Sequence, residues 1–302
     1  MAIQQNARAV TDETTALALD HCAAIVQDLA AGAARWERLG FSLTPESRQR
    51  GAVPGAEQMQ PWATANRCAI LADTYLELVG VVDGSAFNPW EKLLARGEGL
   101  HIAAVRCGNA DAAHAALAKR TDAFAAPVPR ERTVDVDGEP RVMRFRNVFS
   151  RDATWPEARY IVIEHQTPDY LWQPRYMQHD NGACELVDLS IVADDPATMA
   201  DRLHALSGNA PSASSERLSV LLPGHGHLHV VRSAAFADQY GYMPANRPGL
   251  HAMTVAFENL DRTLALLDDR GVAVARSGDS HWISPQETNG YVMQLIQSRA
   301  AP

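Results

Sequence analysis

The sequence lacks the features that mark exported, membrane or nucleic-acid-binding proteins. No window reaches the roughly 18 consecutive apolar residues of a membrane span, and the start, Met1 to Arg8, has no basic region followed by an apolar run. Lys and Arg form no run, and the formal net charge is -9, so neither nucleic acid nor an anionic membrane is the expected partner. We therefore expect a cytoplasmic protein that acts on a small molecule.

The motifs of several large enzyme classes are also missing. The four cysteines are far apart and form no C-x-x-C pair, which favours reduced thiols: Cys22, Cys68, Cys107 and Cys184. P-loop, dinucleotide-binding glycine, G-x-S-x-G and S-x-x-K patterns do not occur as structured motifs. Phosphoryl transfer, nicotinamide chemistry and nucleophilic hydrolysis therefore have no support in the sequence.

The composition is that of an ordinary globular protein. The chain has 302 residues, of which 46% are hydrophobic and 21% charged, and this size favours about two domains. Residues 1–15 are polar for the most part and are expected to form a disordered tail.

A unit of strand, helix and about three strands follows the tail. An apolar strand over 19–26 carries His21, and a helix over 28–39 has Asp28 placed to cap it and Gly40 placed to end it. Short strands follow, and the last of them holds Glu77 among apolar neighbours.

The same order returns three times. The second unit begins with His101, contains a hairpin around Asp137-Gly138 and ends in a strand with Glu164. A third unit starts near 186–192 and a fourth at Leu250-His251. Placing 100–117 over 250–267 matches Leu, His, Val, Asn, Asp, Ala and Leu without a gap, at seven of eighteen positions. Because three of these matches are polar, internal duplication is the economical explanation.

Isolated ionisable groups in apolar strands are the main functional signal. A lone imidazole or carboxylate is costly to bury unless it is paired. One such group closes the first unit (Glu77) and another opens the second (His101), which suggests a shared metal ion. The alternative is a hydrogen-bonded His–Glu pair with a structural role only.

This organisation resembles the vicinal oxygen chelate superfamily, which includes glyoxalases, bleomycin-resistance proteins and extradiol dioxygenases. Within it, the glyoxalase-like domain branch is the most similar. The resemblance rests on segments such as Leu19-Asp-His, Arg38-Leu-Gly-Phe, Ala65-Asn-Arg, Tyr75-Leu-Glu-Leu, Trp172-Gln-Pro and His179-Asp-Asn-Gly-Ala. It implies an α+β fold of four βαβββ modules, paired into two cup-shaped mixed-sheet domains. We place these at 16–178 and 184–302, with a linker over 179–183.

The resemblance also implies a ligand set for a divalent ion such as Zn, Mn, Fe, Ni or Co. Mapped onto this sequence, the ligands are His21, Glu77, His101 and Glu164, and Glu77 or Glu164 would also serve as a catalytic base. A register error of one residue would exchange Glu164 with His165.

The second pair of units departs from this pattern. Val187 stands at the position that matches His21, and Gln294 at the position that matches the closing carboxylate. These replacements favour a structural role for the second pair of units. A second metal site is still a candidate there, because alternating histidines share one face of a strand. Its residues would be His225, His227, His229 and His251.

Three functions remain open. The first is a metal-dependent lyase, isomerase or epimerase that moves a proton on a small carbonyl or enediol substrate. The second is an Fe(II)-dependent extradiol dioxygenase that cleaves a phenolic ring, and the third is a binding protein of the drug-resistance type without catalysis. A homodimer is kept open as the assembly.

Overall fold

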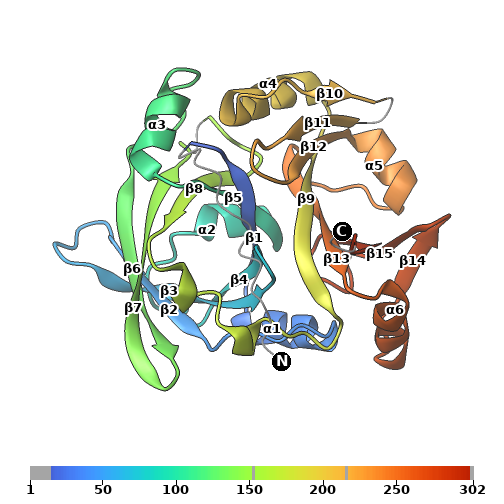
Figure 1. Ribbon diagram of the computed structural model, residues 1–302, viewed down its shortest axis with the longest axis horizontal. Coiled ribbons are helices and arrows are strands. Elements are labelled where there is room, and N and C mark those ends of the chain that lie inside the picture. The colour runs from blue at the N-terminus through green and yellow to red at the C-terminus, as the bar shows by residue number, and fades with distance from the viewer. Residues whose placement is uncertain (1–14, 152–153, 215–216, 300–302) are drawn as a thin grey trace, which may run out of the picture.

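The strands of the protein form two eight-stranded mixed sheets, as the computed structural model shows (Figure 1). The structure describes residues 15–151, 154–214 and 217–299, so the tail predicted for 1–15 lies outside the described residues except for Thr15. Each sheet contains two βαβββ modules, which confirms the predicted fold class. No helix among the described residues is long and apolar enough to cross a membrane.

The first sheet is built from the first two modules. A short helix, α2 (Glu91–Leu94), lies in the connection between them. The first module comprises β1 (Ala18–Val26), α1 (Leu29–Arg38), β2 (Ser47–Gly51), β3 (Gln60–Ile70) and β4 (Tyr75–Val81). The second comprises β5 (Gly99–Arg106), α3 (Ala110–Ala118), β6 (Val128–Val136), β7 (Glu139–Phe149) and β8 (Arg159–His165).

The second sheet repeats this plan after two short 3₁₀ turns, η1 (Pro168–Tyr170) and η2 (Pro174–Tyr176). Another helix, α5 (Ser233–Tyr240), lies between its modules in the position that α2 has in the first sheet. The third module comprises β9 (Ala183–Ala193), α4 (Pro196–Ser207), β10 (Ser212–Ala213), β11 (Arg217–Leu221) and β12 (His227–Arg232). The fourth comprises β13 (Gly249–Phe257), α6 (Leu260–Asp269), β14 (Val274–Ser277), β15 (Ser280–Ile283) and β16 (Val292–Gln297).

The strand order places the first strands of paired modules at the centre of each sheet. The orders are β2-β3-β4-β1-β5-β8-β7-β6 and β10-β11-β12-β9-β13-β16-β15-β14. Within each module the first strand pairs in parallel with the last, and the first strands of the two modules pair antiparallel. The strands that carry His21, Glu77 and His101 are therefore neighbours.

Local signals account for the ends of the helices. The side chain of Asp28 accepts a hydrogen bond from the Ala31 amide at 3.0 Å, so it caps α1 as predicted. Asn109 and Asn259, the matched asparagines of the repeat, cap α3 and α6 in the same way. The Asp137-Gly138 turn joins β6 to β7, and both residues have positive φ, as a two-residue hairpin turn requires.

The first sheet curls around α2, while α1 and α3 lie outside the curl (Figure 1). Trp90 and Leu94 of the α2 segment are buried against Ala23, Ile25 and other residues of the concave face. The curl brings distant strands together, because Arg132 of the edge strand β6 donates a hydrogen bond to Asn66 of β3 at 3.1 Å. The concave face of this sheet is therefore an enclosed environment.

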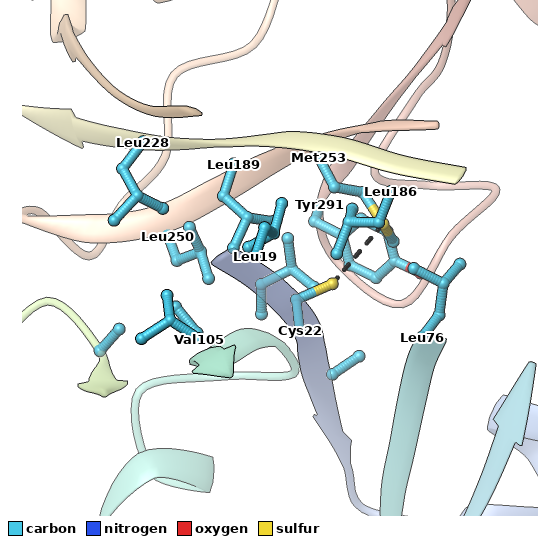
Figure 2. Close-up of a cluster of buried hydrophobic side chains, with 14 of the residues drawn as sticks. Leu19, Cys22, Leu76, Val105, Leu186, Leu189, Leu228, Leu250, Met253 and Tyr291 are labelled. Carbon is cyan, nitrogen blue, oxygen red and sulfur yellow. Dashed lines mark hydrogen bonds between the residues drawn. The ribbon is translucent and has the colours of Figure 1, made fainter. Parts of the chain in front are cut away.

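The other faces of the two sheets pack against each other in one hydrophobic core. Figure 2 shows side chains of β1, β4 and β5 meeting those of β9 and β13, with the Cys22 thiol 3.8 Å from the Met253 sulfur. Leu19, Leu76, Leu186 and Leu189 are fully buried there. This core contains residues from both halves of the chain. The domain boundaries expected at 16–178 and 184–302 therefore stay predictions.

We expect Gly80→Ala to destabilise the fold by about 1–3 kcal/mol, the usual cost of overpacking. Strand β4 approaches α1 so closely that a Cβ on Gly80 would lie 2.6 Å from the Leu29 Cα. Gly84→Ala is the matched control, since a Cβ there meets nothing within 4 Å. Urea unfolding measures both variants, and equal stability of the two would contradict this account of the packing.

Candidate active site

His21 and Glu77 lie together on the concave face of the first sheet. In the parallel pairing of β1 and β4, His21 is opposite Tyr75 and Ala23 is opposite Glu77. The His21 Nε2 atom is 3.8 Å from the Glu77 Oε2 atom, and the two residues are only 3% and 7% exposed. The structure thus brings together two of the four predicted metal ligands.

Asp20 orients the His21 ring. A β-bulge in β1 between Leu19 and His21 lets these consecutive residues contact each other in the interior. Asp20 Oδ1 lies 2.6 Å from His21 Nδ1, and Asp20 Oδ2 lies 3.1 Å from His165 Nε2. Burial alone would raise the pKa of Asp20, but the contacts with His165 and His21 outweigh it and hold the pKa well below its usual value.

These contacts fix where His21 can exchange a proton. An ionised carboxylate only accepts hydrogen bonds, so the proton shared with Asp20 is on Nδ1 of His21. The Nε2 atom, which faces Glu77 and the Tyr75 hydroxyl, is therefore the ring nitrogen left for contact with a ligand. Histidines that bind metal ions commonly donate their other ring N–H to a carboxylate, which fixes the tautomer in the same way.

The Glu77 carboxylate is held from the other side. Asn66 donates a short hydrogen bond to Glu77 Oε1, and Arg132 donates in turn to Asn66. The Tyr75 ring stacks on His21 with centroids 4.2 Å apart, and its hydroxyl is 3.4 Å from His21 Nε2. Burial, with the nearby charges of Asp20 and Glu77, raises the pKa of Tyr75 well above its usual value, so the hydroxyl stays protonated.

Glu164 lies on the opposite face of the sheet, which corrects the predicted ligand set. Its Oε2 accepts a hydrogen bond from the Ala110 amide at 2.8 Å, at the start of α3. Residues alternate along β8, so His165 and not Glu164 faces the concave side with Asp20. The structure thus shows the exchange of Glu164 with His165 that a register error of one residue would produce.

His101 is also separated from His21 and Glu77. It sits at a bulge in β5, where its Nε2 bonds the Gly97 carbonyl at 2.8 Å. His251 does the same with the Asn246 carbonyl at 2.8 Å, at the matching bulge of β13. The repeated Leu-His sequence is thus explained by two equivalent backbone contacts. His101 and Glu164 cannot join the predicted metal site without a change of register.

The second concave face carries a polar network at the matching positions. Asp188 is opposite His227 of β12 and Thr254 of β13, as His21 is opposite Tyr75 and Ala104. The counterpart of His21 is therefore Asp188, one residue beyond the predicted Val187. By the same register, His229 is the counterpart of Glu77.

This second network is satisfied internally. Thr254 donates to Asp188 Oδ1 at 2.6 Å, and His229 Nε2 is 3.5 Å from Asp188 Oδ2. His229 Nδ1 is 2.8 Å from the Ser219 hydroxyl, while Tyr240 donates to Gln294 at 3.2 Å.

The histidines predicted for the second metal site are only partly assembled. His227 and His229 stack with ring centroids 5.7 Å apart. His225 precedes β12 and pairs with Glu185 at 2.5 Å, and His251 is at the β13 bulge. The four residues therefore do not share one site.

The connector between the sheets covers part of the first concave face. Trp172 makes edge contacts with His165 and Tyr75, with ring centroids 5.0 and 6.1 Å away. Leu171, Tyr176 and Met177 pack beside it on a buried cluster that includes Tyr75. The aromatic connector thus shields the His21 end of the site from water.

His21 and Glu77 fit two ligands of a divalent ion, but no complete protein-only set is present. Structural and catalytic zinc sites use three or four protein ligands. The described residues contain no group of three or more His, Cys, Asp or Glu side chains arranged to hold a metal ion. An ion bound by His21 and Glu77 would therefore need further ligands from substrate or water.

Comparison with known proteins establishes the class. The sequence model of the glyoxalase-like domain matches residues 19–207, which is more than half of the chain. The fold is that of the vicinal oxygen chelate superfamily, and the chain belongs to the glyoxalase-like domain family. No curated protein matches the chain at a significant level.

Solved structures share the fold at low sequence identity. A hypothetical protein from Staphylococcus aureus has a TM-score of 0.61 and 10% identity, over 93% of this chain and 100% of that one. A triply substituted variant of 4-hydroxymandelate synthase from Streptomyces coelicolor has a TM-score of 0.62 and 13% identity, over 95% of each chain. A fusion of a xylose isomerase-like TIM barrel and 4-hydroxyphenylpyruvate dioxygenase has a TM-score of 0.56 and 15% identity, over 96% of this chain and 50% of that one.

We expect His251 to make the protein less stable in mild acid. Burial lowers its pKa to about 4, partly opposed by the Asn246 carbonyl, while Arg96, His101 and Arg247 lower it further. The unfolded histidine binds a proton at higher pH than the folded one, so stability falls as the pH drops from about 6.5 to about 4. Over this pH range the free energy of unfolding falls by roughly 3 kcal/mol, at about 1.4 kcal/mol per pKa unit.

Urea unfolding at pH 7 and pH 4.5 measures this effect. His251→Gln should flatten the dependence, because the Gln amide can still donate to Asn246 and takes up no proton. His204, an exposed residue of α4, supplies the control variant His204→Gln. An unchanged pH dependence in His251→Gln would rule out this residue as the cause.

Proposed function

We propose that the chain is an enzyme that moves a proton on a small carbonyl or enediol substrate, with its active site on the concave face of the first sheet. The observation that carries this proposal is the buried pair of His21 Nε2 and Glu77 Oε2, 3.8 Å apart, with each partner held by its own polar support. Two proton carriers that face one space are what an isomerase, lyase or epimerase needs.

Each residue of the pair has a separate role. Glu77 takes the proton from the carbon next to the substrate carbonyl, because its Oε2 is not the oxygen bonded to Asn66. His21, protonated at Nε2, gives a proton to the carbonyl oxygen, which produces an enediol or enol with no net change in the number of protons. To form the isomer, Glu77 delivers its proton to the former carbonyl carbon while His21 Nε2 takes a proton from the neighbouring hydroxyl, which becomes the new carbonyl.

The surroundings favour this chemistry. Asp20 stabilises the imidazolium that His21 must carry before it donates, as the carboxylate partner of a catalytic histidine does. The Trp172 contact and the Tyr75 ring exclude water from the same end of the site. A divalent ion held by His21 Nε2 and Glu77 would take the place of the proton on Nε2, and its polarisation of the substrate oxygens would then replace the proton donated by His21.

Hydrogen–deuterium exchange tests the proton transfer directly. A panel of small α-hydroxy carbonyl compounds in D₂O should include one whose carbon-bound proton exchanges in the presence of the protein, as followed by proton NMR. Glu77→Gln should slow this exchange by about 100-fold or more, because a positioned general base contributes on that order.

Glu164→Gln is the matched control for Glu77→Gln. Glu164 caps α3 on the other face of the sheet, so its loss should leave the exchange rate within about twofold if the fold is intact. Equal loss in both variants would refute the assignment of Glu77. Oxygen consumption on a catechol with added Fe(II), in place of exchange, would favour the extradiol dioxygenase alternative.

Metal content is a separate measurement with its own expected outcome. If His21 and Glu77 hold a divalent ion, purified wild-type protein should carry it, and His21→Ala or Glu77→Ala should remove it. His204→Ala, with its exposed position on α4, should keep full occupancy. Full occupancy in the His21 and Glu77 variants would place the ion elsewhere.

A further inference from the structure

Two arginines of β6 lie on the concave face of the first sheet, which is also the face of His21 and Glu77. Arg130 and Arg132 alternate on one face of the strand, roughly 7 Å apart at twice the rise per residue. The guanidinium carbon of Arg130 is 5.8 Å from the Phe149 ring centroid, and that of Arg132 is 5.5 Å from the Phe145 ring centroid. The two phenylalanines belong to the neighbouring strand β7 and pack on the concave cluster.

Arg130 lacks a carboxylate partner among the described residues. Among the ion pairs formed by the described residues, none involves Arg130, and its contact is with the Phe149 ring. Arg144 and Arg146, on the outer face of β7, do have carboxylates within 4 Å. Burial lowers the pKa of Arg130, which shows that the charge is partly withdrawn from water. A half-buried cation without a counterion is costly, so the site favours an anion.

Asn147 provides a second, independent indication of a ligand. It lies between Phe145 and Phe149 on β7, and alternation places it on their concave face. The residue is 6% exposed, and within the described part of the chain its Oδ1 atom has no hydrogen-bond partner. Buried side-chain polar atoms almost always have a partner. The amide can rotate to present either a donor or an acceptor to a bound molecule.

A hydrogen-bonded arm links these residues to the reacting end. Arg132 donates to Asn66 at 3.1 Å, and Asn66 donates to Glu77. Arg132, one of the two residues of this arginine wall, is therefore joined to Glu77 through Asn66. A carboxylate bound by the arginine wall would direct the rest of a substrate toward Glu77.

We propose that Arg130, Arg132 and Asn147 bind the carboxylate of the substrate, and that Phe145 and Phe149 border its planar, apolar part. Guanidinium groups match the planar geometry of a carboxylate, and charge-assisted hydrogen bonds are about twice as strong as neutral ones. This assignment of a substrate class, a small planar carboxylic acid, rests on the proposed function for the location of the reacting end. The binding of the anion itself does not depend on that function.

Benzoate and its uncharged analogue benzamide are suitable probes in isothermal titration calorimetry. Benzoate should bind the wild-type protein at least tenfold more tightly than benzamide does. Arg130→Gln should weaken benzoate binding by about 10- to 100-fold, the range for a charge-assisted hydrogen bond, and change benzamide binding less than twofold. Asn147→Ala should weaken benzoate binding by about three- to tenfold.

Arg144→Gln is the matched control, since Arg144 is an exposed residue of the neighbouring strand on the outer face. It should leave benzoate affinity unchanged, and urea unfolding of each variant confirms that the fold is retained. Equal affinity for benzoate and benzamide would overturn the proposal. So would an undiminished benzoate affinity in folded Arg130→Gln, or no benzoate binding at millimolar concentration.

A further variant separates this proposal from the proposed reaction. Glu77→Gln should keep benzoate binding within about threefold while it slows proton exchange by about 100-fold or more, because the Gln amide oxygen can still accept from Asn66 and so leaves Arg132 in place. If the wild-type protein and all variants bind benzoate but none of them catalyses proton exchange, the result supports the carboxylate site and contradicts the reaction. Proton exchange with no preference for benzoate supports the reaction and contradicts the carboxylate site.

Discussion

The β-bulge at Asp20 is the constraint on which the candidate site depends. In a regular strand Asp20 and His21 would point to opposite faces, and the carboxylate could not reach the ring Nδ1. The bulge places them in contact at 2.6 Å and also brings Asp20 to His165 of β8. A fully buried carboxylate is costly unless it is paired, and two imidazoles meet that need. The same contacts that make Asp20 tolerable in the core therefore set the direction of His21 Nε2.

Duplication explains why similar sequences serve different purposes in this chain. The bulges of β5 and β13 give His101 and His251 equivalent contacts with backbone carbonyls, so their repetition reflects the construction of the sheets. The concave positions have diverged instead. His21 and Glu77 correspond to Asp188 and His229, and the latter pair is engaged with Thr254 and Ser219. The Asp188–His229 network is closed by short hydrogen bonds, whereas His21 Nε2 has only the longer contacts with the Tyr75 hydroxyl at 3.4 Å and Glu77 at 3.8 Å.

Patterns in the sequence predict the modules and the cap of α1, whereas the closeness of His21 and Glu77 is implied by the family resemblance. Alternation and turn residues are local, so the Asp28 cap and the Asp137-Gly138 turn can be interpreted without the structure. The face on which a strand residue lies depends on bulges, and these shift the register by one residue without a clear sequence signal. For this reason the sequence predicts Glu164 where the structure places His165 on the concave face. Arg130, Arg132 and Asn147 were missed because their significance arises from the curl of the sheet.

The charges on the concave face are arranged in two walls. Carboxylates and imidazoles from β1, β4 and β8 form one, and guanidinium groups from β6 form the other, joined by the Asn66 contact. Within this enclosed sheet, water screens the two walls less than it would at the surface, so each favours the opposite charge on a ligand. A neutral molecule would gain little from either wall. In the proposed binding mode, the anionic end of a substrate is attracted by the guanidinium groups and repelled by the carboxylates, so its charge orients it before any proton moves.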